Sequence, residues 1–319
     1  MKALVTGGAG FIGSHLVDNL LARGWDVVAL DDLSAGTVDH LARATQNPAF
    51  SFVTGSAGDP ALVGELVTDV DTVFHLAAIV GVRRFAQAAP ASIVSNVRSC
   101  EVVFEAASRR KVPVFFASSS EVYGGRDHAC REDAPLTLGA STVPRWSYAA
   151  TKITGEHLAL AHGAHGGSPA VVGRFFNTVG PRQSDRYGMV LPSFVRAALS
   201  GAPLEVHGDG AQTRSFALVT DVVEAVVRLT TTAAAFGQIF NIGSDQEISI
   251  LELAQCVKRL TGSSSPITQV PYAQVFGASF EDPRRRVPEL ARVRAVIGLT
   301  APRPIEAIVG EVIESMRAH

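Results

Sequence analysis

The feature that most constrains the fold is a short apolar strand that runs into a glycine-rich turn and then into an amphipathic helix. The strand is predicted at Lys2–Thr6, glycines follow at positions 7, 8, 10 and 13, and the helix is predicted at Ile12–Arg23. Glycine permits a tight turn and lets backbone N–H groups approach an anion, while the helix N-terminus supplies a positive potential. This pattern is typical of the first β–α unit of a dinucleotide-binding sheet.

Apolar strands and helical segments continue to alternate through the first half of the chain. Further strands are predicted at Asp26–Leu30, Ser51–Thr54, Thr72–Leu76, Val112–Ala117 and Ala170–Phe175. Further helices are predicted at Pro60–Thr68, Ala91–Arg110 and Ser147–His162. Continuous apolar strands separated by helices indicate a parallel sheet covered on both faces. The sequence therefore predicts an α/β fold with a Rossmann-type, doubly wound parallel sheet.

The second half has a different pattern, in which loops containing Pro and Gly separate the elements. Helices are predicted near Pro192–Ser200, Thr220–Thr231, Ile250–Thr261 and Pro304–Arg317, and one strand at Gln238–Ile242. We expect residues 1–175 to form the dinucleotide-binding domain, with a strand near 238–244 returning to it. Residues 176–319 are expected to form mainly a smaller C-terminal, substrate-binding lobe over the carboxyl edge of the sheet.

Charge and residue usage exclude several classes of function. The 319 residues hold 28 Lys+Arg and 30 Asp+Glu, whereas proteins that bind nucleic acid or anionic membranes carry a basic excess, so neither partner is expected. The absence of a long apolar run or a signal-peptide pattern predicts no membrane span and a cytoplasmic protein. Cys100, Cys130 and Cys256 are far apart, and His162 and His165 lack metal-ligand spacing, so neither a disulfide framework nor a metal site is expected.

Two acidic residues close the second predicted strand. Asp31 and Asp32 follow Gly13 by about 20 residues, where a carboxylate can accept the adenosine ribose hydroxyls of a dinucleotide. A carboxylate there would repel the additional phosphate of NADP, so the predicted cofactor is NAD. Asp32 could instead cap the following loop, which makes Asp31 the firmer candidate.

A tyrosine and a lysine stand four residues apart on one face of the helix predicted at Ser147–His162. Tyr148 becomes a base near neutral pH if the Lys152 ammonium and a positively charged nicotinamide stabilise its phenolate. Lys152 can also hold the nicotinamide ribose. Ser119, on the loop after Val112–Ala117, is placed to hydrogen-bond the substrate hydroxyl whose proton Tyr148 removes.

Several longer motifs extend along the chain. They are TGGAGFIGSH at 6–15, DDLSAG at 31–36, HLAA at 75–78, SSSEVYG at 118–124, YAATK at 148–152, RFFNTVGPR at 174–182 and GDGAQTRSF at 208–216. Together they resemble the extended short-chain dehydrogenase/reductase family that acts on nucleotide sugars, over essentially the whole chain. In that family NAD stays bound, the sugar C4 hydroxyl is oxidised, the keto sugar reacts, and the hydride usually returns.

The resemblance implies a UDP-linked sugar substrate and roles for two further groups of residues. The cofactor would contact Gly7, Gly10, Phe11, Ile12, Gly13, Asp31, Asp32, Ser34, Gly36, Leu76, Ala77, Ala78, Tyr148 and Lys152. The substrate would contact Asn177, Leu191, Phe194, Glu205, His207, Arg214, Arg285 and Arg286. The family often has an Asp that contacts adenine where this chain has Ser56. Apolar residues on more than one face of the helices predicted at 91–110 and 147–162 indicate either a homodimer, as is common in the family, or burial within the monomer.

Glu121 separates the possible reactions. Simple 4-epimerases of the family usually have a small or hydroxyl residue at this place, whereas Ser120–Glu121 resembles UDP-glucuronate decarboxylases and some 4,6-dehydratases. Oxidation at C4 turns UDP-glucuronate into a β-keto acid, whose C6 carboxylate can leave as CO2 without a metal. The resulting hypothesis has Ser119 supporting the oxyanion, Ser120 and Glu121 positioning the carboxyl group, and Arg286 helping to protonate C5.

Three other functions remain open. The main alternative is a UDP-sugar 4-epimerase acting on UDP-glucose or UDP-glucuronate. A dehydratase is disfavoured because such enzymes are expected to carry an acid in place of Ser120. A non-catalytic NAD-binding regulator is disfavoured because Ser119, Tyr148 and Lys152 are all present.

Overall fold

The computed structural model describes the chain except residues 81, 126–129, 185–188, 277–281, 300–301 and 318–319, together with the side chains of residues 82–89. Its main sheet has seven strands in the order β11-β6-β5-β4-β1-β2-β3, and all neighbouring strands run parallel. The strands are β1 (Lys2–Thr6), β2 (Asp26–Asp31), β3 (Phe50–Thr54), β4 (Thr72–His75), β5 (Val114–Ser119), β6 (Ala170–Phe175) and β11 (Gln238–Ile242). This is the Rossmann strand order with β11 added beside β6, which confirms the predicted fold class.

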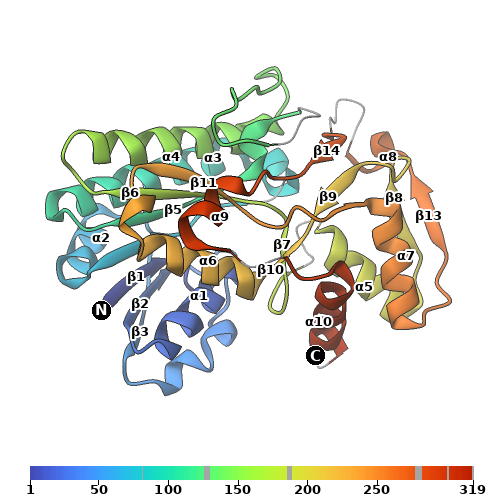
Figure 1. Ribbon diagram of the computed structural model, residues 1–319, viewed down its shortest axis with the longest axis horizontal. Helices are drawn as coiled ribbons and strands as arrows, with labels where there is room; N and C mark the ends of the chain where they lie inside the picture. The colour runs from blue at the N-terminus through green and yellow to red at the C-terminus, as the bar shows by residue number, and fades with distance from the viewer. Residues whose placement is uncertain (81, 126–129, 185–188, 277–281, 300–301, 318–319) are drawn as a thin grey trace.

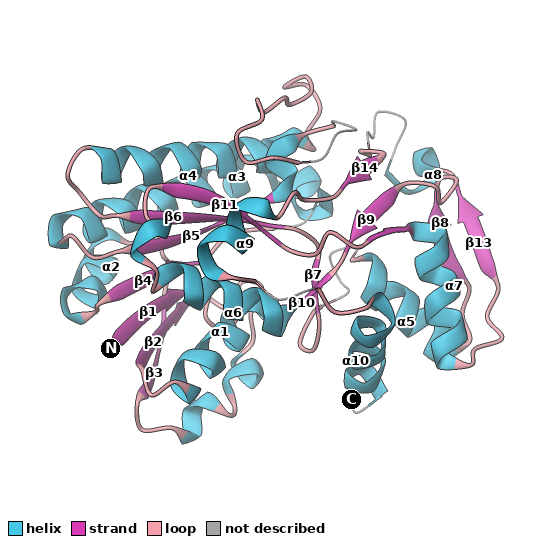
Figure 2. Ribbon diagram, viewed as in Figure 1, coloured by secondary structure: helices cyan, strands magenta, loops and turns pink. Residues whose placement is uncertain are grey.

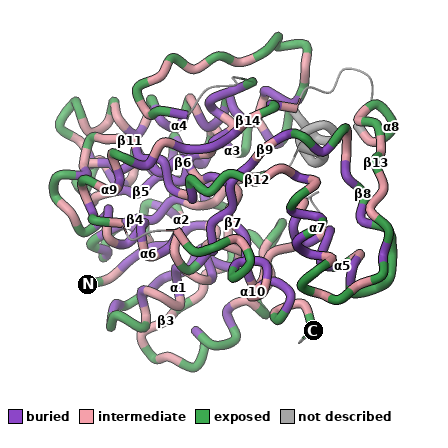
Figure 3. The backbone as a smooth tube through the Cα atoms, turned by 45° about the vertical axis from the view of Figure 1, so that its right-hand side comes forward, coloured by how far each residue is buried: buried purple, intermediate pink, exposed green. Residues whose placement is uncertain are grey.

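Helices cover both faces of the sheet (Figure 2). One face packs against α1 (Phe11–Ala22), α6 (Val219–Thr230) and α9 (Ala291–Ile297), and the other against α2 (Pro60–Leu66), α3 (Val82–Arg110) and α4 (Trp146–Ala164). Successive strand residues point to opposite faces, so Val5 lies in the first apolar cluster and its neighbour Leu4 in the second. Both side chains are fully buried, as is most of the central sheet in Figure 3.

A second, less regular region lies beyond the carboxyl edge of the sheet, on the right of Figure 1. Its helices are α5 (Val190–Ser200), α7 (Ile250–Thr261), α8 (Tyr272–Phe276) and α10 (Ile305–Arg317). Its strands are β7 (Thr178–Val179), β8 (Leu204–His207), β9 (Thr213–Ser215), β10 (Ala217–Leu218), β12 (Glu247–Ser249), β13 (Ile267–Val270) and β14 (Arg285–Arg286). They pair as β10-β7, β12-β9-β14 and β13-β8. Helices α5, α7 and α10 share a separate apolar core.

The chain crosses between the two regions repeatedly. After β10 it returns to the main sheet as α6 and β11, and α9 packs on β11 later in the chain. Strand β11, in the stretch 238–244 where a returning strand was expected, pairs with β6 of the main sheet. No helix of the described residues is long and apolar enough to span a membrane.

Some element boundaries differ from those predicted. Helix α3 begins at Val82 and runs through Pro90, whereas the sequence pattern placed its start at Ala91 because proline favours the first turn of a helix. Strand β5 begins after Pro113 and continues to Ser119, in register with Phe175 of β6. The short strands of the second region were not predicted, since two to four residues are too few to show a periodicity.

Candidate active site

A cavity of about 830 Å³ lies between the carboxyl edge of the main sheet and the second region. Its lining begins at the β1–α1 turn, passes the ends of β2, β4 and β5 and the first turns of α4, and continues into residues of α5, β8 and β9. The cavity therefore opens beside the point between β1 and β4 where the strand order reverses, which is where open α/β sheets bind ligands.

The glycine turn forms one end of this cavity and leaves no space for side chains. Gly7 has a φ of +73°, and a Cβ added to Gly13 would lie 2.0 Å from the Gly7 carbonyl oxygen. No side chain caps the N-terminus of α1 at Gly10, and the first turn holds no acidic residue. The amides at the start of α1 thus remain available to an anion such as a dinucleotide pyrophosphate.

Asp31 lies at the end of β2 and is tied to the glycine turn. Its carboxylate accepts hydrogen bonds from the Ala9 amide (3.0 Å) and the Leu33 amide (2.8 Å). Burial raises the pKa of Asp31 against the effect of these bonds. Asp32 is exposed and accepts a hydrogen bond from the Ser34 amide, whereas the short helix later in this loop is capped by Thr37. Ser56 also lines this end of the cavity.

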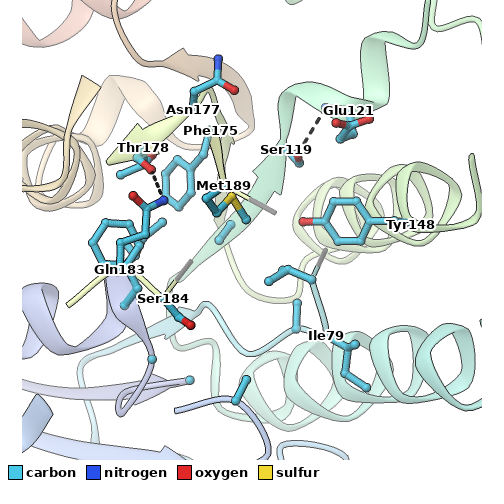
Figure 4. A pocket seen from close by; sticks show the side chains of 18 of the residues that line it. Ile79, Ser119, Glu121, Tyr148, Phe175, Asn177, Thr178, Gln183, Ser184 and Met189 are labelled. Carbon is cyan, nitrogen blue, oxygen red and sulfur yellow. Dashed lines mark hydrogen bonds between the residues drawn. The ribbon is translucent and has the colours of Figure 1, made fainter. Parts of the chain in front are cut away.

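Tyr148 and Lys152 lie on the first turns of α4, at the middle of the cavity. The Lys152 ammonium is buried, donates a hydrogen bond to the Ala117 carbonyl oxygen (2.7 Å) and lies 5.9 Å from the Tyr148 ring centre. Burial lowers the pKa of Lys152 to about 8. Burial also raises the pKa of Tyr148, and a hydrogen bond with Ser119 acts in the opposite direction. In Figure 4, the Tyr148 hydroxyl points into the pocket on the side where Ser119 ends β5.

Glu121 stands just beyond this pair, in the 3₁₀ turn Ser120–Tyr123 whose start is capped by the Ser119 hydroxyl. Its carboxylate forms ion pairs with Arg286 and, at 3.3 Å, with Arg145. Burial alone would raise the pKa of Glu121, but the charges of Arg286, Arg145 and Arg214 lower it to about 2. Glu121 is therefore ionised at neutral pH.

The ion pairs around Glu121 continue into a larger charged cluster. Arg214 pairs with Asp282 at 2.9 Å, and Arg145 approaches the same carboxylate at 3.7 Å. Tyr272 donates a hydrogen bond to the second oxygen of Asp282 (2.7 Å). We call Glu121, Arg145, Arg214, Asp282 and Arg286 the charged cluster; all five line the cavity.

The structure brings most of the predicted site residues together. Those that line the cavity are Gly7, Gly10, Phe11, Ile12, Gly13, Asp31, Asp32, Ser34, Gly36, Leu76, Ala77, Ala78, Ser119, Ser120, Glu121, Tyr148, Lys152, Asn177, Phe194, Glu205, His207, Arg214 and Arg286. Leu191 does not; it is fully buried in the core of the second region, while Met189, Val190 and Ser193 reach the cavity instead. Arg285 points away and pairs with Glu247 at 2.7 Å.

Sequence reasoning did not identify Arg145, Asp282 or Tyr272. Arg145 precedes Tyr148 by one helical turn, so its place beside the tyrosine was a usable signal. Asp282 and Tyr272 belong to a segment without a regular pattern, and their position depends on long-range packing. Among the described residues, no group of three or more His, Cys, Asp or Glu side chains is placed to hold a metal ion.

The open amides, Asp31 and the Tyr148–Lys152 pair fit NAD, and together with the fold they define an NAD-dependent enzyme of the short-chain dehydrogenase/reductase kind. The chain belongs to the NAD-dependent epimerase/dehydratase family, whose model matches residues 3–243.

Named relatives include both decarboxylases and epimerases. The chain is 40% identical to a UDP-N-acetyl-alpha-D-glucosaminuronate decarboxylase of Bacillus cytotoxicus, over 92% of this chain and 90% of that protein. It is 33% identical to UDP-glucuronic acid decarboxylase 1 of Arabidopsis thaliana, over 92% of this chain and 65% of that enzyme's length. The structure of a UDP-glucuronic acid 4-epimerase from Bacillus cereus, in complex with UDP-glucuronic acid and NAD, superposes with a TM-score of 0.88 at 27% identity and covers all of both chains.

Proposed function

We propose that this chain is an NAD-dependent UDP-glucuronic acid decarboxylase, which oxidises C4, releases C6 as CO2 and yields a UDP-4-keto-pentose or UDP-xylose. The observation that supports this most is the charged cluster, where three guanidinium groups surround two carboxylates. Counted within the charged cluster alone, this leaves one positive charge in excess. The C6 carboxylate of a uronate sugar can pair with this positive charge, whereas the uncharged C6 group of a hexose cannot.

In the first chemical step, Tyr148 acts as the base. When bound, NAD accepts a hydride from C4 of the sugar and later returns it. Tyr148 removes the proton of the C4 hydroxyl, and Ser119 supports the oxygen through a hydrogen bond. The Lys152 ammonium stabilises the phenolate and is itself oriented by the Ala117 carbonyl.

The second step breaks the C5–C6 bond. With a carbonyl at C4, the electron pair of that bond moves into the carbonyl as CO2 leaves, so the carboxylate must be held with its C5–C6 bond perpendicular to the carbonyl plane. We assign the positioning of this carboxylate to Ser120 and Glu121, and to Arg286 the role of helping to protonate C5. Return of the hydride to C4, with a proton from Tyr148, completes the formation of the pentose.

The 40% identical relative is named for a 2-acetamido uronate, and the carboxylate at C6 is what that sugar shares with glucuronate. The experiment incubates the protein with NAD and, separately, UDP-glucuronate and UDP-N-acetylglucosaminuronate, and follows CO2 release and product masses. We expect one nucleotide sugar to lose the mass of CO2, and Glu121→Ala to abolish that loss.

Glu314→Ala is the matched control because Glu314 is exposed on α10. Its product yield should equal that of the wild type. A product of unchanged mass with inverted C4, formed equally by Glu121→Ala, would replace the decarboxylase by the 4-epimerase.

We also propose a homodimer formed through α3 and α4, in the cytoplasm. Val94 is 66% exposed on α3, and Ile93 and Val97 are half-buried beside it without belonging to an apolar cluster of the monomer. Such an unpaired apolar stripe suits a second copy of the chain. Val94→Arg should shift the mass measured by light scattering from two chains to one. The three free, buried cysteines suit a reducing compartment.

A further inference from the structure

Arg182 is a cavity residue to which neither the sequence analysis nor the reaction assigns a role. It lies in the segment between β7 and α5 and has a φ of +66°, a backbone conformation that few residues other than glycine adopt. Figure 4 shows its neighbours Gln183 and Ser184 across the pocket from Tyr148. Arg182 itself lines the cavity together with the glycine turn.

Two contacts fix this segment to helix α1. The Arg182 guanidinium pairs with Asp18 at 2.7 Å, and both side chains are largely shielded from solvent. One turn earlier on α1, a ring nitrogen of His15 lies 2.9 Å from the Pro181 carbonyl oxygen. The same helix presents its N-terminal amides to the cavity, so the arginine is held beside the dinucleotide end of the site.

The other half of the guanidinium has no partner. Its Nη1 atom is buried and makes no hydrogen bond with any described residue. A buried cationic donor without an acceptor is costly, and it is stabilised when an anion supplies the acceptor.

The surroundings of Arg182 contain no competing cation among the described residues of α1 and the glycine turn. Burial lowers the pKa of both His15 and His40, and the nearby charge of Arg182 lowers each further. His40 is in turn bonded to the Ala9 carbonyl oxygen inside the glycine turn (3.0 Å). The electrostatic influence of Arg182 thus reaches the two histidines that lie beside the turn.

We propose that Arg182 donates from Nη1 to the pyrophosphate of bound NAD, so that the phosphates are held between the N-terminus of α1 and a guanidinium from the second region. Asp18 acts as the positioning residue that aims the guanidinium. The inference depends on the cofactor of the family and does not require decarboxylation. Its consequence is slow cofactor release, which a reaction that returns the hydride to the same sugar requires.

The test measures the affinity of the apoprotein for three probes by calorimetry: NAD, ADP-ribose and adenosine. Only the first two contain the pyrophosphate. For Arg182→Met we expect the affinities for NAD and ADP-ribose to fall about 10- to 100-fold while that for adenosine is unchanged. Arg182→Lys keeps the positive charge but loses the planar guanidinium, so the affinities for NAD and ADP-ribose should fall by a smaller factor, again with no change for adenosine. Arg317→Met, on the exposed last turn of α10, is the matched control.

A purely structural role predicts other results. If Arg182 only tethers its segment to α1, Asp18→Asn should weaken all three probes as much as Arg182→Met does. An unchanged NAD affinity in both Arg182 variants, or an equal loss for adenosine, would overturn the proposal. If Arg182→Met does not fold, Arg182→Lys with the same three probes decides between these outcomes.

Discussion

The two ends of the cavity are built in different ways. At the dinucleotide end, the glycine turn presents backbone amides to the cavity, and the residues of this turn lie close together in the sequence. At the sugar end, the charged cluster brings together side chains from four distant segments. The structure of the dinucleotide end depends on glycines that have no side chain, and the structure of the sugar end depends on the balance between opposite charges. A methyl group should therefore damage the first, whereas the loss of one charge should damage the second.

The largest expected effect lies where the two ends meet. Tyr148→Phe removes the group that takes the C4 proton, so turnover should fall about 10²- to 10⁴-fold. Binding of NAD should be retained, because the glycine turn and Asp31 are untouched. Mass spectrometry of the products and titration with NAD measure the two quantities separately. A variant that lost NAD affinity in parallel with turnover would show that the ends are not independent.

Gly13→Ala should break the dinucleotide end alone. The added Cβ would meet the Gly7 carbonyl at 2.0 Å, so either the turn or the helix must move, at a cost of about 3 kcal/mol in the free energy of unfolding. NAD affinity should fall about 100-fold, as measured by calorimetry. Gly64→Ala is the matched control, since a Cβ there meets nothing within 4 Å on α2; it should bind NAD normally and be slightly more stable.

Glu121→Gln should break the sugar end and leave NAD affinity unchanged. At pH 7 the variant should lose about 2 to 3 kcal/mol in the free energy of unfolding, because Arg145 and Arg286 lose a buried partner. The pKa of Glu121 is lowered from 4.5 to about 2 in the folded state, so its contribution is complete above pH 4.5 and is lost as the pH falls through 2.

Denaturant unfolding at several pH values measures this contribution. The difference in stability between wild type and Glu121→Gln should shrink steadily from pH 5 toward pH 2. Glu314→Gln provides the comparison: Glu314 is exposed on α10 and forms no ion pair or hydrogen bond with a described residue, so no pH-dependent difference is expected. A constant gap between wild type and Glu121→Gln over this range would contradict the ion pairs described here.

The smallest expected effect is that of Asp31→Asn. This variant removes a charge at the dinucleotide end, where the glycine turn presents backbone amides to the cavity. The amide side chain can still accept one of the two backbone hydrogen bonds that Asp31 makes with Ala9 and Leu33. NAD affinity should fall about 10-fold, and discrimination against NADP should weaken because the repelling carboxylate is gone. Competition between NAD and NADP for the apoprotein measures both. Unchanged discrimination against NADP would show that the Asp31 carboxylate does not repel the additional phosphate.

The same contrast explains what could be predicted from the sequence. Strands β1, β6 and β11 and helix α7 begin and end where the sequence patterns placed them, since each is long enough to show a periodicity. The glycine turn, Tyr148 and Lys152 were found because their spacing is local. Asp282 was missed because its position depends on long-range packing, which leaves no local pattern, whereas Arg145 was missed although its place one helical turn before Tyr148 was a usable signal.

Two residues that motif resemblance predicts as substrate contacts, Leu191 and Arg285, do not line the cavity. Leu191 and Arg285 are next to cavity-lining residues in the sequence, but Leu191 faces inward on α5 and Arg285 faces Glu247 on the short strand β14. On a helix or a strand, neighbouring residues point in different directions. Motif matching places such residues to within one position, and the structure is needed to decide which one reaches the ligand.

The position of β11 has a consequence for synthesis of the chain on the ribosome. This strand pairs with residues 171–175 of β6, yet about sixty residues, most of them in the second region, are translated between the two. A nascent chain halted before Gln238 leaves one edge of β6 without a partner, and unpaired strand edges invite pairing with other chains. The sheet is completed only after the first part of the second region, β7 to β10, has emerged, and the rest of that region follows β11, so the two regions mature together rather than one after the other.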